Sequence, residues 1–168
     1  MPEHAQKEKH EAHRRLVERL RQQAEDVRRL TAGLGEELIA KRSIPEKWSL
    51  KELVCHLQRV QAVFAGRVET MLAQENPVIS PYEPEGDGEF EKTVAQPAKD
   101  SLASFLETRE RLAWHLDQLT PAEWHRGGRH PEFPNYDIHF QVEYMAHHEA
   151  HHIYQMFQRR APLCKIPH

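Results

Sequence analysis

The chain has 168 residues, 39% of them hydrophobic and 29% charged, and this balance predicts one globular domain over residues 1–168 that buries a core. Its 23 basic and 26 acidic side chains are mixed along the chain and give a net charge of −3, so nucleic acid is not an expected partner. No run approaches the ~18 apolar residues of a membrane span, and residues 1–8 lack the apolar region of a signal peptide. We therefore expect no membrane partner. Cys55 and Cys164 lie far apart, and this pattern suits a reducing, cytoplasmic location.

The first predicted helix lies in residues 7–38, which contain no proline and carry leucine and valine near helical spacing. Gly33 and Gly35 are expected to end it, ahead of a short turn at residues 36–39. Arginines on its outer face alternate with acidic residues. A solvated helix face therefore explains them better than a phosphate-binding stripe does.

The second predicted helix has the clearest start in the sequence. Ser49 can accept from the backbone of Glu52, whose side chain can reach back to the Ser49 amide, and this reciprocal cap begins a helix that runs toward Leu72. His56 falls on the apolar face of that helix. A single core-facing histidine is more often a neutral imidazole hydrogen-bonded to a neighbour than a metal ligand.

Residues 74–100 are rich in proline and acidic side chains and predict a long connection between the second and third helices. A lid, a partner surface and a solvated crossover are all compatible with this composition. Asp100 is expected to cap the third helix. Thr120 and Pro121 are expected to follow that helix as the N-cap and first residue of a short helical turn.

The segment 124–136 contains paired glycines and two prolines, so it predicts a compact loop before the last helix. His130 in this loop is either a contact for a metal or substrate, or an exposed loop histidine, and the second interpretation is favoured. Asn135 or Asp137 is expected to cap the last helix, which should extend to about Arg160.

The last predicted helix carries four histidines in two i, i+4 pairs, a spacing at which two imidazoles on one helix face can hold one metal ion. Apolar residues choose between the pairs, because steps of three or four residues connect Ile138, Val142, Met145, His148, His152 and Met156. His148 and His152 should therefore face the core, whereas His147 and His151 should face the bundle edge or solvent. Together with His56, the buried pair makes a candidate metal site.

These motifs together resemble the DinB/YfiT-like superfamily of metal-binding four-helix bundles. The matching stretches are LGEEL at 34–38, WSLKELVCHL at 48–57, GRHPEF at 128–133 and HEAHHIYQM at 148–156. The resemblance implies an all-α four-helix bundle with a long crossover between helices 2 and 3. It also implies that the metal ligands are His56, His148 and His152.

Three imidazoles leave coordination positions open, which is typical of a catalytic metal site. The expected cofactor is a divalent ion, with zinc or nickel ahead of iron or cobalt. Because some relatives are thiol-dependent S-transferases, the resemblance implies a metal-dependent hydrolase or a thiol S-transferase with a small-molecule substrate. A non-catalytic, metal-binding or stress-associated bundle is the alternative. Glu149, His147 and Tyr144 are candidate acids or bases, with none preferred, so the catalytic residues are unassigned.

Two further expectations concern assembly and pH. Relatives often pair through bundle helices, which implies a two-fold homodimer, although no helix shows a second continuous apolar stripe. Phe140 and Tyr144 are the residues expected nearest such a contact. Because imidazole must be neutral to bind a metal, affinity is expected to fall below a pH of about 6.5, the ordinary pKa of histidine.

Overall fold

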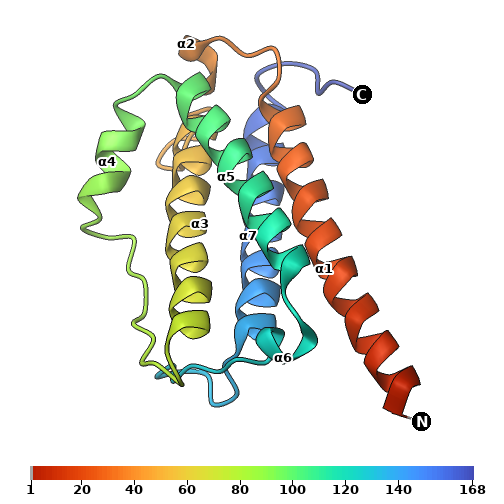
Figure 1. Cartoon of the computed structure of the whole chain (residues 1–168). Helices are drawn as coiled ribbons and strands as arrows, with labels where there is room; N and C mark the ends of the chain where they lie inside the picture. The colour runs from red at the N-terminus through yellow and green to blue at the C-terminus, as the bar shows by residue number, and fades with distance from the viewer. Residues whose placement is uncertain (1) are drawn as a thin grey trace.

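Four long helices form a bundle in the computed structural model (Figure 1): α1 (Pro2–Thr31), α3 (Leu50–Ala73), α5 (Ala98–Gln118) and α7 (Ile138–Arg160). The structure describes residues 2–168, with side chains from residue 10 onward. Helices α1 and α3 each contact both α5 and α7, so α1 lies diagonally opposite α3. Helices α1 and α7 run in one direction, and α3 and α5 run in the other (Figure 1). The predicted all-α four-helix bundle is confirmed.

Three short helices occupy the connections: α2 (Glu36–Ile39), α4 (Gly88–Val94) and α6 (Pro121–Trp124). Residues 74–97 return from the lower end of α3 to the upper end of α5 and carry α4 along the outside of α3 (Figure 1). The Asp87 carboxylate fixes this crossover, because it accepts from Arg59 Nε at 3.0 Å and from the Tyr82 hydroxyl at 2.8 Å. The predicted long crossover is thus an ordered segment attached to α3.

Local capping rules predicted the starts of three helices, α3, α6 and α7. Ser49 and Glu52 form the reciprocal cap of α3, and Thr120 caps α6 ahead of a proline. The Asp137 carboxylate accepts from the Phe140 amide at 2.8 Å and caps α7, which ends at Arg160 as predicted. These caps supply acceptors for backbone N–H groups that have no partner inside the helix.

The predicted cap of α5 is wrong. The helix begins at Ala98, with Pro97 as its N-cap, so Asp100 lies inside the first turn. The Ala98 amide instead donates to Glu36 Oε2 at 2.8 Å, and this carboxylate comes from α2. The helix start therefore depends on a tertiary contact that local sequence does not contain.

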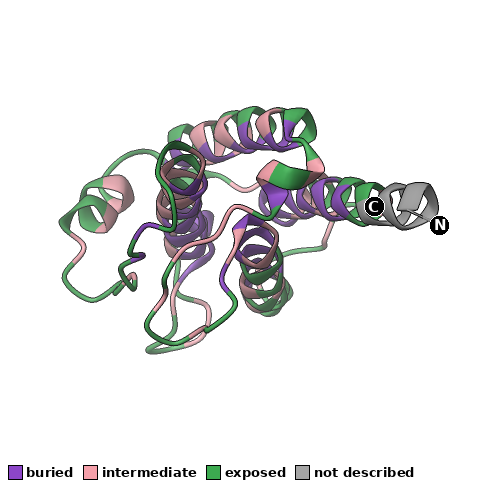
Figure 2. Cartoon of the chain, turned by 60° about the horizontal axis from the view of Figure 1, so that its bottom comes forward, coloured by how far each residue is buried: buried purple, intermediate pink, exposed green. Residues whose placement is uncertain are grey.

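Two hydrophobic clusters fill the bundle, and a layer of buried polar side chains lies between them. The lower cluster includes Leu20, Phe64, Leu116 and Met145, and the upper cluster includes Val27, Leu53, Phe105 and Met156. The polar layer contains Gln61, Arg109 and Glu149. Buried positions follow the inward faces of the helices when the bundle is seen from its lower end (Figure 2). The polar layer positions the candidate site, because His148 and His152 flank Glu149 on α7.

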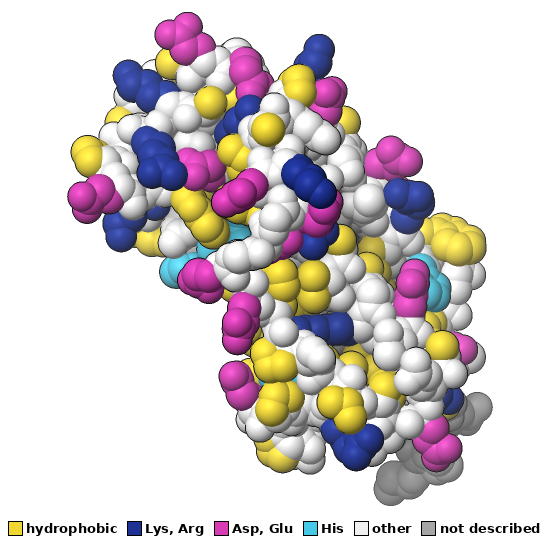
Figure 3. Space-filling view, turned by 90° about the vertical axis from the view of Figure 1, so that its left-hand side faces the viewer, with side chains coloured by type: hydrophobic (Ala, Val, Ile, Leu, Met, Phe, Trp, Pro, Cys, Tyr) yellow, Lys and Arg dark blue, Asp and Glu magenta, His cyan; other side chains and the backbone are white. Residues whose placement is uncertain are grey.

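The surface is charged and mixed in sign. Acidic and basic side chains are interspersed over the face that carries the crossover (Figure 3). Within the described residues, no helix is long and apolar enough to cross a membrane.

Candidate metal centre

Three imidazoles meet where α3 faces α7. His56 lies in the second turn of α3, and His148 and His152 lie one turn apart on α7. One ring nitrogen from each lies within 4.8 Å of the other two, and no other such group occurs among the side chains the structure describes. The helical spacing predicted that each of these residues faces the core, and the family resemblance implied that they form one group. His147 and His151 are exposed, as predicted from the apolar spacing.

A glutamine fixes the orientation of one imidazole. His152 Nδ1 lies 2.8 Å from Gln155 Oε1, and the amide nitrogen of Gln155 lies 3.3 Å from His151 Nε2. An amide oxygen only accepts, so the proton of His152 sits on Nδ1 and its Nε2 carries a lone pair. This Nε2 faces His148 Nε2 at 3.1 Å.

The donor set fits a divalent metal ion. Tetrahedral zinc with three imidazole ligands needs nitrogens about 3.3 Å apart, since each Zn–N distance is about 2.0–2.1 Å. The His148 and His152 nitrogens are already close to that spacing at 3.1 Å. The Nδ1 atoms of His56 and His148 are buried without a hydrogen-bond partner in the described part of the chain. The protein alone therefore leaves this polar cluster incompletely paired, unlike most buried polar groups.

Burial holds the three imidazoles in their neutral, ligand-competent form. Loss of solvent lowers the pKa of His56 to about 3 and that of His148 to about 4, and the neighbouring imidazoles add to both shifts. Burial also lowers the pKa of His152, although the bond to Gln155 opposes this effect. All three rings therefore present lone pairs near neutral pH.

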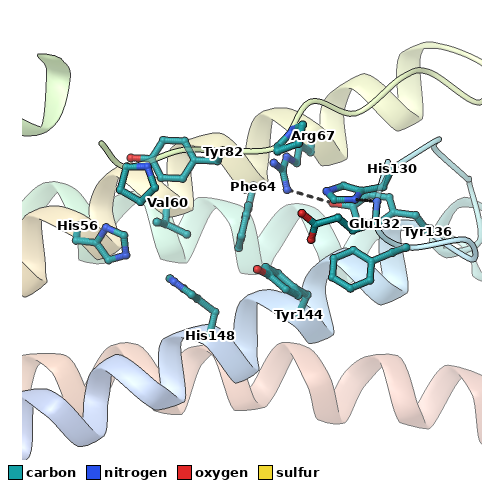
Figure 4. Close-up of a pocket in the computed structure, with 13 residues that line it drawn as sticks. His56, Val60, Phe64, Arg67, Tyr82, His130, Glu132, Tyr136, Tyr144 and His148 are labelled. Carbon is teal, nitrogen blue, oxygen red and sulfur yellow. Dashed lines mark hydrogen bonds between the residues drawn. The ribbon is translucent and has the colours of Figure 1, made fainter. Parts of the chain in front are cut away.

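A cavity of about 300 Å³ extends from the cluster along α3 and α7 (Figure 4). His56 and His148 line one end of it, and Arg67, His130 and Tyr136 line the other. The cavity is large enough for a small molecule next to the three imidazoles. Its polar walls include groups that the sequence did not bring together.

A loop contact at the lower end of the bundle positions the far wall of the cavity. The Ile79 amide of the crossover donates to the Arg129 carbonyl at 2.8 Å, and the Gly128 amide donates to the Tyr136 carbonyl at 2.9 Å. A Cβ at Gly128 would lie 2.9 Å from Ile79 Cγ1, so this close approach requires glycine. The contact holds His130 over the cavity.

The favoured interpretation of His130 as an exposed loop histidine is wrong, because the residue is half-buried and lines the cavity. Its ring stacks on Tyr136 at 5.0 Å between ring centroids. Its Nδ1 accepts from the Glu132 amide at 3.1 Å, so Nε2 carries the proton. Burial and the charge of Arg67 lower the pKa of His130, so it is a neutral donor at pH 7.

Two charged groups in the cavity, Arg67 and Glu132, were not predicted from the sequence. Arg67 donates to the Ser80 carbonyl at 2.7 Å, to the Tyr136 hydroxyl at 3.4 Å and to Gln141 Oε1 at 3.3 Å, and none of these described partners is a carboxylate. It follows His56 by eleven residues, about three helical turns, so its place on the same face of α3 could have been predicted. Glu132 lies in the loop stretch at 128–133, and Figure 4 shows its carboxylate directed into the cavity.

The three acid or base candidates from the sequence separate clearly. Glu149 is buried in an ion pair with Arg109, away from the cavity, which removes it as a proton carrier there. His147 is exposed and lies 3.8 Å from Glu143. Tyr144 is the candidate that lines the cavity, together with the unpredicted Glu132.

The bundle topology and the three-histidine cluster define the class: an all-α protein with a candidate metal centre between two helices. The model of the DinB superfamily matches residues 19–156. Because this match covers most of the chain, the protein belongs to the DinB superfamily.

Two relatives carry the name of putative metal-dependent hydrolase. The one from Halalkalibacterium halodurans is 25% identical over 126 residues, which cover 74% of this chain and 72% of the relative. The one from Oceanobacillus iheyensis is 26% identical over 106 residues, which cover 63% of this chain and 61% of the relative.

The fold is also similar to a solved structure, that of YfiT from Bacillus subtilis. It is described as "a probable metal-dependent hydrolase with an unusual four-helix bundle topology". The TM-score is 0.78, the sequence identity is 19%, and the match covers 90% of this chain and 87% of YfiT. The similarity supports the four-helix bundle fold.

Proposed function

We propose that the protein is a metal-dependent hydrolase whose divalent ion, zinc or nickel, is held by His56, His148 and His152. The observation that carries this proposal is the convergence of three imidazole nitrogens at one end of a cavity of about 300 Å³. Three ligands leave room for water or substrate, as in catalytic sites. The names of the two relatives and of YfiT support the same activity.

A divalent ion at this position supplies Lewis acidity and lowers the pKa of a water molecule bound to it. Residues of the chain then supply proton transfer and hydrogen-bond donors. Glu132 accepts the proton from the attacking water and returns it to the leaving group, since its carboxylate faces the cavity (Figure 4). The Tyr144 hydroxyl, which lies between the two ends of the cavity, is a donor for the carbonyl or leaving-group oxygen, and His130 Nε2–H is a donor for the far end of the substrate (Figure 4).

Arg67 orients the substrate in this proposal. Its guanidinium lies at the far end of the cavity and has no acidic partner among the described side chains, so it can bind a carboxylate or another anionic group. A substrate that spans the cavity would place its scissile bond near the three imidazoles. The substrate class is therefore a small ester or amide with an anionic end.

The test is a hydrolysis screen of small esters and amides, each with and without a terminal carboxylate, by the zinc- and nickel-loaded protein. We expect turnover that disappears on chelation and returns with metal. Glu132→Gln should reduce kcat by about 10²–10⁴-fold while metal stays bound. His147→Ala is the matched control and should leave the rate unchanged. Metal-loaded protein that hydrolyses no member of the panel would contradict the proposal.

The same screen separates the two other readings of this site. An open coordination position also accepts a thiolate, so low-molecular-weight thiols with electrophilic acceptors belong in the panel. Transfer to a thiol without hydrolysis would identify an S-transferase. Bound metal that raises the unfolding temperature without supporting either reaction would identify a non-catalytic metal-binding bundle.

We also propose a homodimer and a cytoplasmic location. Two exposed aromatic side chains on α7 support a contact between copies: Tyr154 and Phe157. Phe140 and Tyr144 are less suited than expected, because Phe140 packs on Phe133 and Tyr144 lines the cavity. Sedimentation at micromolar concentration tests the dimer, and a single species of 19.7 kDa would exclude it.

Both cysteines are free, which supports a reducing compartment.

A further inference from the structure

A second group of histidines lies at the lower end of the bundle, on elements distant in sequence. His13 comes from α1, His125 follows α6, and His139 is the second residue of α7. The ring centroid of His13 lies 5.1 Å from that of His139 and 5.6 Å from that of His125. Nothing in the proposed hydrolase reaction uses this group, because none of its members lines the cavity.

The closest contact in this group joins two ring nitrogens across the bundle. His13 Nδ1 lies 3.1 Å from His139 Nδ1, although the residues are 126 positions apart. Carboxylates hold the outer nitrogens: His139 Nε2 lies 3.5 Å from Glu143, and His125 Nδ1 lies 3.2 Å from Asp137. A carboxylate on the outer nitrogen places the proton there and leaves the inner nitrogen as a lone-pair donor.

His13 is held in place for such a role. Its ring stacks on Trp124 at 4.5 Å with an interplanar angle of 5°, and only 4% of the residue is exposed. Its Nε2 is buried without a hydrogen-bond partner in the described part of the chain. Burial lowers the pKa of His13 to about 4, and the nearby His139, His125 and His10 add to the shift. A neutral, fixed imidazole therefore faces a second imidazole that a carboxylate orients.

The arrangement repeats that of the first centre. In both, two imidazole nitrogens approach to 3.1 Å, and an oxygen engages the outer nitrogen of one of the rings. His139 precedes His148 by nine residues, so the groups lie about two and a half turns, or about 14 Å, apart on opposite faces of α7. The two centres are thus separate sites on one helix.

One difference sets the expected affinity. Only the first centre brings three ligand atoms within 4.8 Å among the described residues. In the second group His125 must turn its ring away from Asp137 to join the other two, and its side chain is 48% exposed, so there is open space for this turn. The second group should therefore bind a cation more weakly than the first.

We propose that His13 and His139, joined by His125, bind a second divalent transition-metal ion at the lower end of the bundle. Imidazole ligands select zinc, nickel or copper over magnesium or calcium. The bound ion would join α1, the α6–α7 loop and the start of α7, and this loop carries His130 and Glu132. The inference is independent of the hydrolase proposal, since it requires no reaction at either centre.

Nickel titration by calorimetry tests the proposal in the full chain. Wild type should bind two equivalents, the second more weakly. His139→Ala and His152→Ala should each bind one, and the double variant should bind none. His115→Ala, which changes a histidine outside both groups, should still bind two. Circular dichroism verifies that each variant remains helical. One equivalent in wild type that is lost in His152→Ala would overturn the proposal.

Tryptophan fluorescence gives a second, local readout. Trp124 stacks on His13, whereas Trp48 lies 4.9 Å from His56, so each centre has its own tryptophan. The variant Trp48→Phe/Trp114→Phe keeps Trp124 as its only tryptophan, since the chain has three. Paramagnetic nickel should quench Trp124 in step with the second equivalent. Adding His139→Ala should remove that quenching, and equal quenching with and without this change would overturn the proposal.

Discussion

Helix α7 carries two buried polar groups close together in sequence: Glu149, which pairs with Arg109, and the histidines His148 and His152. They differ in how far the protein itself completes their hydrogen bonds. The Glu149 carboxylate accepts hydrogen bonds from both terminal nitrogens of Arg109, the one from Nη1 at 2.8 Å. Arg109 also donates to the Leu20 carbonyl at 2.7 Å and to Gln61 Oε1 at 2.6 Å. This group is closed, because its strongest donors and acceptors find partners inside the protein.

The histidine cluster on the neighbouring face is open. His148 and His152 direct nitrogens at each other, and the Nδ1 atoms of His56 and His148 lack partners in the described structure. Burial alone therefore does not distinguish a structural polar group from a binding site. The distinction lies in whether the protein completes the hydrogen bonds or leaves lone pairs for a ligand.

The largest expected effect comes from breaking the closed group. Arg109→Ala leaves the Glu149 carboxylate buried and unpaired, which should reduce the free energy of unfolding by about 3–5 kcal/mol. Urea denaturation of the metal-free protein measures this loss. Arg111→Ala, on the exposed face of α5, is the control and should change stability by less than about 0.5 kcal/mol. Equal losses in the two variants would show that the closed group is not a structural element.

Removing one histidine from the cluster should weaken metal binding and leave the fold intact. His152→Ala or His56→Ala should weaken metal affinity by more than about 100-fold, since each removes one of three ligands. Each of these substitutions should reduce the free energy of unfolding of the metal-free protein by less than Arg109→Ala does. Equilibrium dialysis with elemental analysis measures the affinity. His147→Ala and His151→Ala should bind normally, and loss of metal in these two variants would show that the wrong pair was chosen.

Gln155 lies outside the cluster but orients one of its rings. Gln155→Ala removes the acceptor for His152 Nδ1 and should weaken metal affinity by about 10–100-fold. The unfolding free energy of the metal-free protein should hardly change. Gln155→Glu retains an acceptor and should keep most of the affinity. If both variants bind as wild type, the outer hydrogen bond does not orient the ligand.

The pH response sharpens the same comparison. The ordinary histidine pKa predicts loss of metal below about pH 6.5, but burial lowers the pKa of His56 to about 3 and of His148 to about 4. Burial also lowers the pKa of His152, so the fall in affinity should begin below pH 6.5 and not at that value. A metal titration that loses tenfold affinity between pH 7 and pH 6 would contradict these shifts.

The metal-free protein should show the complementary change in stability. Unfolded histidines take up protons near pH 6.5, whereas the folded ones with lowered pKa stay neutral, so the unfolded state gains protons as pH falls. The contribution of these histidines to the free energy of unfolding is fully present above about pH 6.5 and should decline between about pH 6.5 and pH 4. Thermal unfolding across this range, with and without zinc, measures the effect.

The sequence predicted those features that depend on neighbours along a helix. The Ser49 cap, the end of α7 at Arg160 and the inward direction of His148 and His152 all follow from spacing within one helix. The pairing of His56 with the α7 histidines came from the family resemblance. Spacing alone does not show that two helices face each other.

The features that the sequence did not predict depend on contacts between distant segments. The Glu36 carboxylate caps α5 from 62 residues away, and His13 meets His139 across 126 residues. Glu149 was one of three candidate acids or bases, but a helix turns each successive residue by about 100°, so Glu149 faces the core although its neighbour His148 lines the cavity. Its partner Arg109 lies on another helix, and only the folded structure shows the pair.

Anomalous diffraction from crystals of the zinc-loaded protein tests the central claim most directly. We expect a strong peak coordinated by one nitrogen each of His56, His148 and His152, at about 2.0–2.1 Å from each nitrogen. The same data should leave Glu149 paired with Arg109 and without metal. A zinc peak on the exposed His147 and His151, with no density among the three buried imidazoles, would contradict it.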